Sequence, residues 1–230
     1  MVYCYILGAV SLVLTLIFLV VRTTVGGAFG IVTKSLASFA FIALAMIGLM
    51  QTGATIYSVF VVLGLVCGLI GDILLDNKVV YKEHEKIYLN SGMLSFGIGH
   101  LFYFVAASFV ALAINKSGIA LLISLGVSLI LTLIIFLLSK PMKLNFGKFF
   151  YQTLAYTLIL TFMSSYSIIL ACYNSAYWTF AAGVTSIFVS DLVLSTQYFG
   201  GKQDSKLLTW INHLVYYIGQ ILIAASLFLV

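Results

Sequence analysis

Charged residues are scarce in this sequence. Asp, Glu, Lys and Arg make up 7% of its 230 residues, whereas a soluble globular domain has about 25%. The chain also has one proline, Pro141, and three cysteines. The low charge excludes a soluble fold, and the odd number of cysteines argues against a disulfide framework. Glycine-rich nucleotide loops and the GxSxG and HExxH sequences are missing too, which excludes the common nucleotide-binding, serine-hydrolase and zinc-protease templates.

The sequence contains several long runs of apolar residues. Apolar residues make up 63% of the chain, and its mean hydropathy is +1.20. A helix needs about 20 such residues to cross a hydrocarbon core about 30 Å thick. Eight runs are candidates, the second short and the fourth long: residues 3–21, 35–50, 56–76, 89–114, 118–139, 149–172, 176–198 and 210–230. The sequence therefore predicts an all-α, polytopic membrane protein with about eight transmembrane helices in a single integral-membrane domain, residues 1–230.

The first run lacks a basic segment before it and a clear small-residue cleavage site, so we expect a membrane helix there and not a signal peptide. The longest connections are expected at residues 22–34, 77–88, 140–148 and 199–209. None of these is long enough to fold as a separate domain.

Basic residues are distributed unevenly between the connections. If the helices alternate in direction, one face carries Arg22, Lys34, Lys78, Lys82, Lys86, Lys140, Lys143, Lys148, Lys202 and Lys206. The other face carries only Lys116. By the positive-inside rule we expect the basic loops in the cytoplasm and both termini outside, in a plasma membrane or a bacterial inner membrane. Topology thus accounts for the net charge of +5, and no nucleic-acid partner is expected.

Two aspartates stand in otherwise apolar helices, Asp72 in GLIGDILL and Asp191 in IFVSDLVL. An aspartate at membrane depth is costly unless it is paired or used, so both are candidate site residues. Each is followed by a helix with the pattern His-Leu-x-Tyr, which begins at His100 and at His213. This repetition predicts two parallel four-helix repeats. The four side chains are then expected to share one site, at similar depth, facing the cytoplasm.

Other polar residues accompany these four. On the last predicted helix, a stripe with helical spacing consists of His213, Tyr216, Tyr217 and Gln220. Tyr103 follows His100 with the same spacing, and Asp76, one turn after Asp72, is expected to be a solvated interface residue. The wide separation of these Asp and His residues in the sequence disfavours a divalent-metal site, and no cofactor is expected.

Two buried carboxyls can share one proton, so that one serves as a general acid and the other as a general base. Such a pair suits the hydrolysis of an acid-labile bond in a substrate that arrives from the bilayer.

In the order of its motifs, the chain resembles the YhhN and TMEM86-like membrane proteins, which include lysoplasmalogenases. The likeness covers essentially the whole chain and rests on Gly71-Asp72, Gly99-His100 with Tyr103, Ser190-Asp191, Tyr216-Tyr217-x-x-Gln220-x-Leu222-Ile223, Tyr156 and Met163. One departure is Lys34-Ser35, where the family pattern has a Lys-Pro step. His213 is not a family hallmark, so its assignment rests on the internal repeat alone.

The resemblance implies hydrolysis of the vinyl ether of a lysoplasmalogen, a lysophospholipid, to a fatty aldehyde and a glycerophospho-headgroup. It assigns catalysis to Asp72 and Asp191 with His100 beside them, and it leaves open which aspartate is the acid. The residues expected to bind or orient the substrate are Tyr103, Ser190, His213, Tyr216, Tyr217 and Gln220.

Two other classes of function remain open from the residues alone. A proton-coupled transporter or channel also needs intramembrane Asp and His residues, and it predicts flux without covalent change in the substrate. A non-catalytic lipid-binding or scaffold protein predicts that replacing a buried aspartate costs nothing in function.

Overall fold

The computed structural model describes residues 2–230, apart from the side chains of residues 79, 80 and 82. It contains eight long helices: α1 (Val2–Thr24), α2 (Gly27–Thr52), α3 (Ile56–Val80), α4 (Glu85–Ala113), α5 (Ser117–Ser139), α6 (Phe150–Tyr173), α7 (Trp178–Phe199) and α8 (Lys206–Ser226). Short 3-10 helices, η1 (Lys82–His84), η2 (Gly147–Phe149) and η3 (Ser175–Tyr177), precede α4, α6 and α7. Every long helix is apolar enough to cross a membrane. The prediction of an all-α protein with eight membrane-spanning helices is confirmed.

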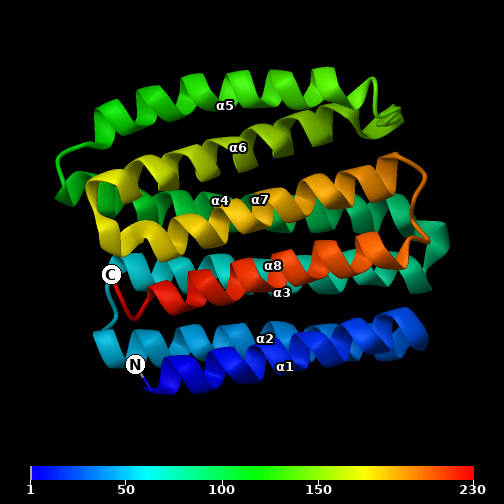
Figure 1. Ribbon diagram of the computed structural model, residues 1–230, viewed down its shortest axis with the longest axis horizontal. Helices are drawn as coiled ribbons and strands as arrows, with labels where there is room; N and C mark the ends of the chain where they lie inside the picture. The colour runs from blue at the N-terminus through cyan, green and yellow to red at the C-terminus, as the bar shows by residue number, and fades with distance from the viewer. Residues whose placement is uncertain (1) are drawn as a thin grey trace.

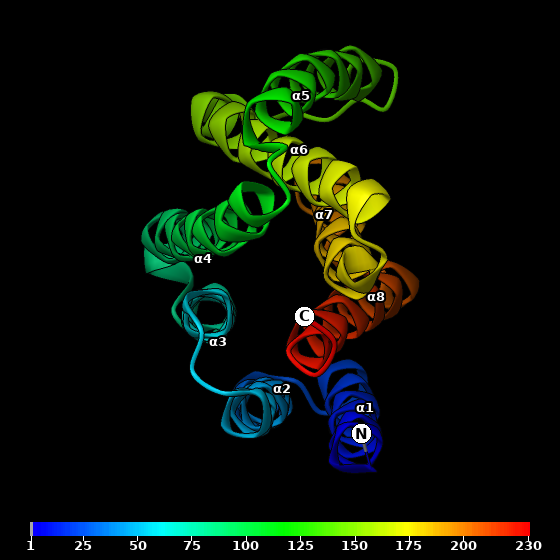
Figure 2. The same ribbon diagram turned by 90° about the vertical axis from the view of Figure 1, so that its left-hand side faces the viewer.

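The helices run back and forth along one axis, so both termini lie at the same end of the bundle (Figure 1). Helix α5 lies at one extreme of the bundle, and α1 and α2 lie at the other (Figures 1 and 2). The leucines of α5, such as Leu122 with 73% of its surface exposed, face outward, as expected for side chains in contact with lipid. On the inner side of α5, Thr132 hydrogen-bonds Thr161 of α6 at 3.0 Å, and this polar contact orients that side of the helix toward α6.

The predicted connection over residues 22–34 is wrong. Helix α1 continues to Thr24 and α2 begins at Gly27, so only a tight turn separates them, in which Gly26 and Gly27 both adopt positive φ. Arg22 and Lys34 are therefore helical residues. The hydropathy pattern did not predict the first part of α2 as helix, because Lys34 interrupts the apolar residues there.

Contacts between the helices follow the same order in the two halves of the chain. Helix α4 packs on α5 and α6, and α8 packs on α1 and α2. Close backbone approaches recur as well. A Cβ atom placed on Gly99 would lie 3.0 Å from the carbonyl oxygen of Gly64, and one placed on Gly219 would lie 2.8 Å from that of Gly183. Such glycine pairs let two helices pack at short distance.

This repeat relates Gly99 to Gly219, not His100 to His213. The residue after Gly219 is Gln220, so Gln220 is the counterpart of His100 in the second half. The repeated His-Leu-x-Tyr pattern therefore does not mark equivalent positions in space, although Asp72 and Asp191 keep the spacing that separates Gly64 from Gly183.

Candidate active site

Asp72 is buried, with 2% of its surface exposed, and its carboxylate is fully engaged. One oxygen lies 3.2 Å from the ammonium of Lys34 on α2. The other accepts hydrogen bonds from the Ser38 hydroxyl at 2.8 Å and from the Tyr216 hydroxyl at 3.0 Å. A cation and two donors stabilise the ionised form of this carboxyl.

Asp76 was expected to be a solvated interface residue, and this expectation is wrong. It is 3% exposed, and its carboxylate lies 3.2 Å both from the ammonium of Lys34 and from the guanidinium of Arg22. Because Asp76 follows Asp72 by one helical turn, the two carboxylates stand on the same face of α3, where one lysine reaches both.

A chain of hydrogen bonds leads from Asp72 deeper into the bundle. Tyr216 donates to Asp72 and accepts from the side-chain amide of Gln220 at 2.8 Å. The amide oxygen of Gln220 in turn accepts a longer bond, 3.4 Å, from Tyr103 on α4. Gly68 leaves the space for Gln220, because a Cβ atom there would lie 2.8 Å from its amide nitrogen. Three of the residues predicted to orient the substrate are thus connected to Asp72.

Tyr217 has a different role from its neighbour Tyr216. Its ring is fully buried between Phe18 of α1 and Phe41 of α2. Its hydroxyl donates to the backbone carbonyl of Lys34 at 3.0 Å and lies 2.9 Å from the hydroxyl of Ser38. It fastens α8 to the part of α2 that carries the ion pair.

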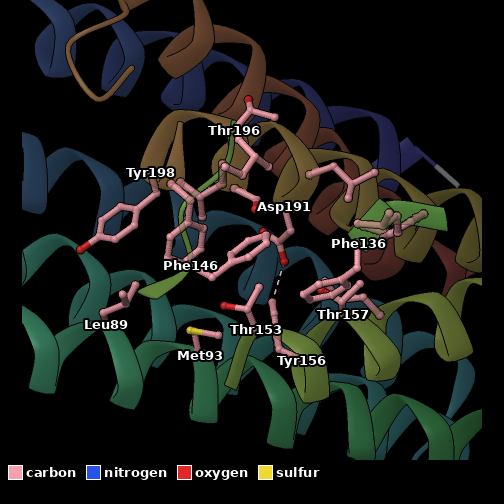
Figure 3. A pocket seen from close by; sticks show the side chains of 18 of the residues that line it. Leu89, Met93, Phe136, Phe146, Thr153, Tyr156, Thr157, Asp191, Thr196 and Tyr198 are labelled. Carbon is pink, nitrogen blue, oxygen red and sulfur yellow. Dashed lines mark hydrogen bonds between the residues drawn. The ribbon is translucent and has the colours of Figure 1, made fainter. Parts of the chain in front are cut away.

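Asp191 has surroundings unlike those of Asp72. Its carboxylate accepts one hydrogen bond, 2.6 Å from the Tyr156 hydroxyl of α6 (Figure 3). Among the described residues no cation forms an ion pair with it. The preceding Ser190 faces away and donates to the Asn212 side chain of α8 at 2.8 Å. Asp191 has one hydrogen-bond donor and no cation beside it. It therefore has fewer interactions than Asp72 that favour an ionised carboxylate.

The two histidines lie in different places. His213 faces the polar cavity described below, with its ring 5.1 Å from that of Phe18. His100 follows Gly99, which is level with Gly64, so it lies about two helical turns deeper than Asp72. The backbone of His100 is therefore not at the depth of the Asp72 backbone, and its side chain points back toward the start of α4, where its ring reaches the Phe96 carbonyl.

Two contacts fix the orientation of the His100 ring. Its Nδ1 bonds the Phe96 carbonyl at 2.9 Å, which makes Nδ1 the protonated nitrogen and leaves Nε2 as an acceptor. Within the described part of the chain, Nε2 has no hydrogen-bond partner. The ring stands edge-on to Tyr156, with 6.5 Å between ring centres, so it is one side chain removed from Asp191.

Two cavities meet at Asp191. A polar cavity of about 660 Å³ lies at the end of the bundle opposite the termini, and its lining includes Asp72, Asp76, His213 and Tyr216. An apolar cavity of about 240 Å³ lies between α4, α6 and α7, and its lining also includes Phe136 of α5 and Phe146 of the connection from α5 to α6 (Figure 3). Six residues line both cavities: Leu75, Lys78, Phe96, Asp191, Leu194 and Tyr198.

An apolar cavity that joins a polar one can accommodate an amphiphilic molecule. Apolar walls with few polar groups suit a hydrocarbon chain, and the polar cavity suits a headgroup and water. A bond at the junction of chain and headgroup would then lie beside Asp191.

The sequence reasoning missed Lys34, Arg22 and Lys78 as site residues, because it counted them as loop charges that set topology. A signal was present for Lys34, which stands among apolar residues shortly before Phe39 and Phe41. A lysine within a membrane helix is costly and indicates a partner. No spacing rule predicts that this partner lies on α3.

The model of the YhhN family matches residues 29–227, which is most of the chain and includes both aspartates. Neither a curated protein nor a solved structure matches the chain. In the described part of the chain, no three His, Cys, Asp or Glu residues are grouped so that they could hold a metal ion.

Proposed function

This chain belongs to the YhhN family, and we propose that it is a membrane-embedded hydrolase that cleaves the vinyl ether bond of lysoplasmalogens. The observation that carries the proposal is the position of Asp191. It lines both the apolar and the polar cavity, and Asp72 lines the polar cavity with it. Two carboxyls in unlike surroundings, at the place where chain and headgroup of a lipid would join, suit acid and base roles.

Their surroundings support one assignment of the two roles. Asp191, with one hydrogen bond and an apolar cavity at its side, is the proton donor. Asp72, held by Lys34 and two hydroxyl donors, is the ionised partner. The opposite assignment would require Asp72 to hold a proton before the reaction begins, beside a lysine 3.2 Å away.

The reaction then follows in three steps. Asp191 gives its proton to the outer vinyl carbon, which leaves an oxocarbenium ion at the carbon bonded to oxygen. Asp72 stabilises this cation and takes a proton from the water that adds to it. The resulting hemiacetal breaks its bond to the glycerol oxygen: its hydroxyl gives up a proton as the aldehyde forms, and the leaving glycerol oxygen takes up a proton, so that no net proton is consumed. Proton exchange through the polar cavity restores both carboxyls.

Four side chains are assigned supporting roles. Tyr156 orients Asp191 through its hydroxyl, and His100, which lines neither cavity, packs edge-on against the ring of Tyr156. Tyr216 orients Asp72 and is itself held by Gln220.

The test is the release of fatty aldehyde from a lysoplasmenyl phospholipid by detergent-purified protein. We expect Asp72→Asn and Asp191→Asn each to lower turnover by about 100-fold or more, the scale of a lost acid or base. Glu83→Gln, which removes an exposed carboxylate outside both cavities, is the matched control. A parallel assay with a chelator tests whether a metal takes part. Full activity of either aspartate variant would refute the mechanism.

Proton-coupled transport is the second candidate, favoured by the hydrogen-bond chain from Asp72 to Tyr103. Among the described residues no further hydrogen bond continues this chain beyond Tyr103, whose ring packs against that of Phe180. Transport predicts flux into liposomes with no aldehyde, and the two assays together separate the candidates.

A further inference from the structure

Lys78 occupies the wall between the two cavities. It lies two residues after Asp76 on α3, is half-buried, and lines both the polar and the apolar cavity. Its ammonium stands 4.1 Å from the centre of the Tyr198 ring. Tyr198 on α7 is in turn held by a hydrogen bond from its hydroxyl to Glu85 at the start of α4.

Among the described residues Lys78 forms no ion pair. The other cations of the polar cavity differ from it. Lys34 and Arg22 are each engaged by aspartates, and Lys206 is exposed at the rim. Lys78 is thus the cation of the cavity lining that is partly desolvated and still has its hydrogen-bond donors available. A tyrosine ring offsets only part of that desolvation, since the attraction of a cation to an aromatic face is weaker than a buried ion pair.

We propose that Lys78 binds the phosphate of a single-chain phospholipid, with Tyr198 holding its ammonium in place. The inference rests on the proposed function, because it takes the lysophospholipid substrate as the ligand. Asp191 and Lys78 line both cavities, so a lipid with its chain in the apolar cavity and its reacting bond at Asp191 passes its glycerophosphate by Lys78. The phosphate then completes the ion pair that the lysine lacks.

The experiment measures binding and not turnover. The probe is a 1-O-alkyl lysophospholipid, whose saturated ether is not a vinyl ether, titrated into detergent-purified protein by calorimetry. The matching 1-O-alkylglycerol has the same chain and no phosphate, and glycerol 3-phosphate and inorganic phosphate have no chain. The variants are Lys78→Met, Lys78→Arg and the control Lys140→Met, which removes an exposed cation outside both cavities.

We expect Lys78→Met to weaken binding of the alkyl lysophospholipid by about 10-fold or more, the scale of a hydrogen bond to a charged group. Binding of the alkylglycerol should stay within about twofold, Lys78→Arg should retain most of the affinity, and Lys140→Met should change neither lipid. Chain-free phosphates should bind much more weakly, because they forgo the apolar cavity.

Other results overturn the inference. Equal loss for both lipids would make Lys78 a structural residue, and no loss for either would place the phosphate elsewhere. Tight binding of glycerol 3-phosphate or inorganic phosphate alone would make the site one for a free phosphate. The aldehyde assay is independent of these outcomes. Lipid binding that depends on Lys78, without aldehyde release, would refute the hydrolase and leave the phosphate site standing.

Discussion

The ammonium of Lys34 on α2 lies 3.2 Å from a carboxylate oxygen of Asp72 on α3, and both side chains are at most 4% exposed. The same ammonium lies 3.2 Å from Asp76. One lysine therefore compensates two aspartates that stand one turn apart, and Arg22 supplies the second positive charge. The cluster of Arg22, Lys34, Asp72 and Asp76 is electrically balanced, which is what burial of four charges requires.

Lys34→Met should destabilise the protein strongly. It removes one charge from the cluster and leaves two buried carboxylates with one cation, a loss of about 3–5 kcal/mol for a broken buried pair. For a chain of this size we expect the melting temperature in detergent to fall by roughly 6–20 °C. Lys140→Met, an exposed change, should leave the melting temperature nearly unchanged. Equal melting temperatures for the two variants would show that the cluster contributes no stability.

The two aspartate variants should differ in stability although both lose turnover. Asp72→Asn takes a charge from Lys34 and should cost about 1–3 kcal/mol. Asp191→Asn removes no ion pair, and its amide oxygen still accepts from Tyr156, so its unfolding free energy should change by no more than about 0.5 kcal/mol. Thermal unfolding of both, measured beside the wild type, checks this. A larger loss for Asp191→Asn would mean that its ionised form is the one that stabilises the fold, and would reverse the assignment of acid and base.

Tyr156→Phe should reduce kcat by about 10-fold with little change in KM. It removes the 2.6 Å hydrogen bond that orients Asp191 and leaves the ring and its packing in place. A hydrogen bond between neutral groups is worth about 0.5–1.5 kcal/mol, and the upper end of that range corresponds to about 10-fold in rate. Steady-state kinetics of aldehyde release provide the measurement. Tyr151→Phe, on the same helix and 79% exposed, is the control and should behave as the wild type. A rise in KM with kcat unchanged would instead place Tyr156 among the substrate-binding residues.

Gly183→Ala should loosen the contact between α7 and α8. A methyl group there would lie 2.7 Å from the carbonyl oxygen of Gly219 and 2.6 Å from the side chain of Ile223. Backbone cannot yield as a side chain can, so we expect a loss of about 1–3 kcal/mol. Gly126→Ala is the matched change in a membrane helix, because nothing lies within 4 Å of a methyl group at that position. It should be neutral in the same melting experiment.

The sequence by itself determined the class of protein, the eight spans, the two aspartates and the likeness to the YhhN family. These features depend on local properties. Hydropathy over about 20 residues reports a membrane helix whatever packs against it, and a carboxylate among apolar residues is conspicuous wherever its partner lies.

The tertiary structure alone decided which charges are paired and how the two carboxyls differ. Lys34 and Asp76 are 42 positions apart, and Tyr156 and Asp191 are 35 apart, on helices whose relative rotation no periodicity specifies. It likewise separated His100 from His213 in depth, because the register between adjacent helices is set where glycines such as Gly64 and Gly99 let the backbones approach. The two cavities that meet at Asp191 and Lys78 exist only once α3, α4, α6, α7 and α8 are packed, since a cavity is a property of the side chains that surround it and belongs to no single segment.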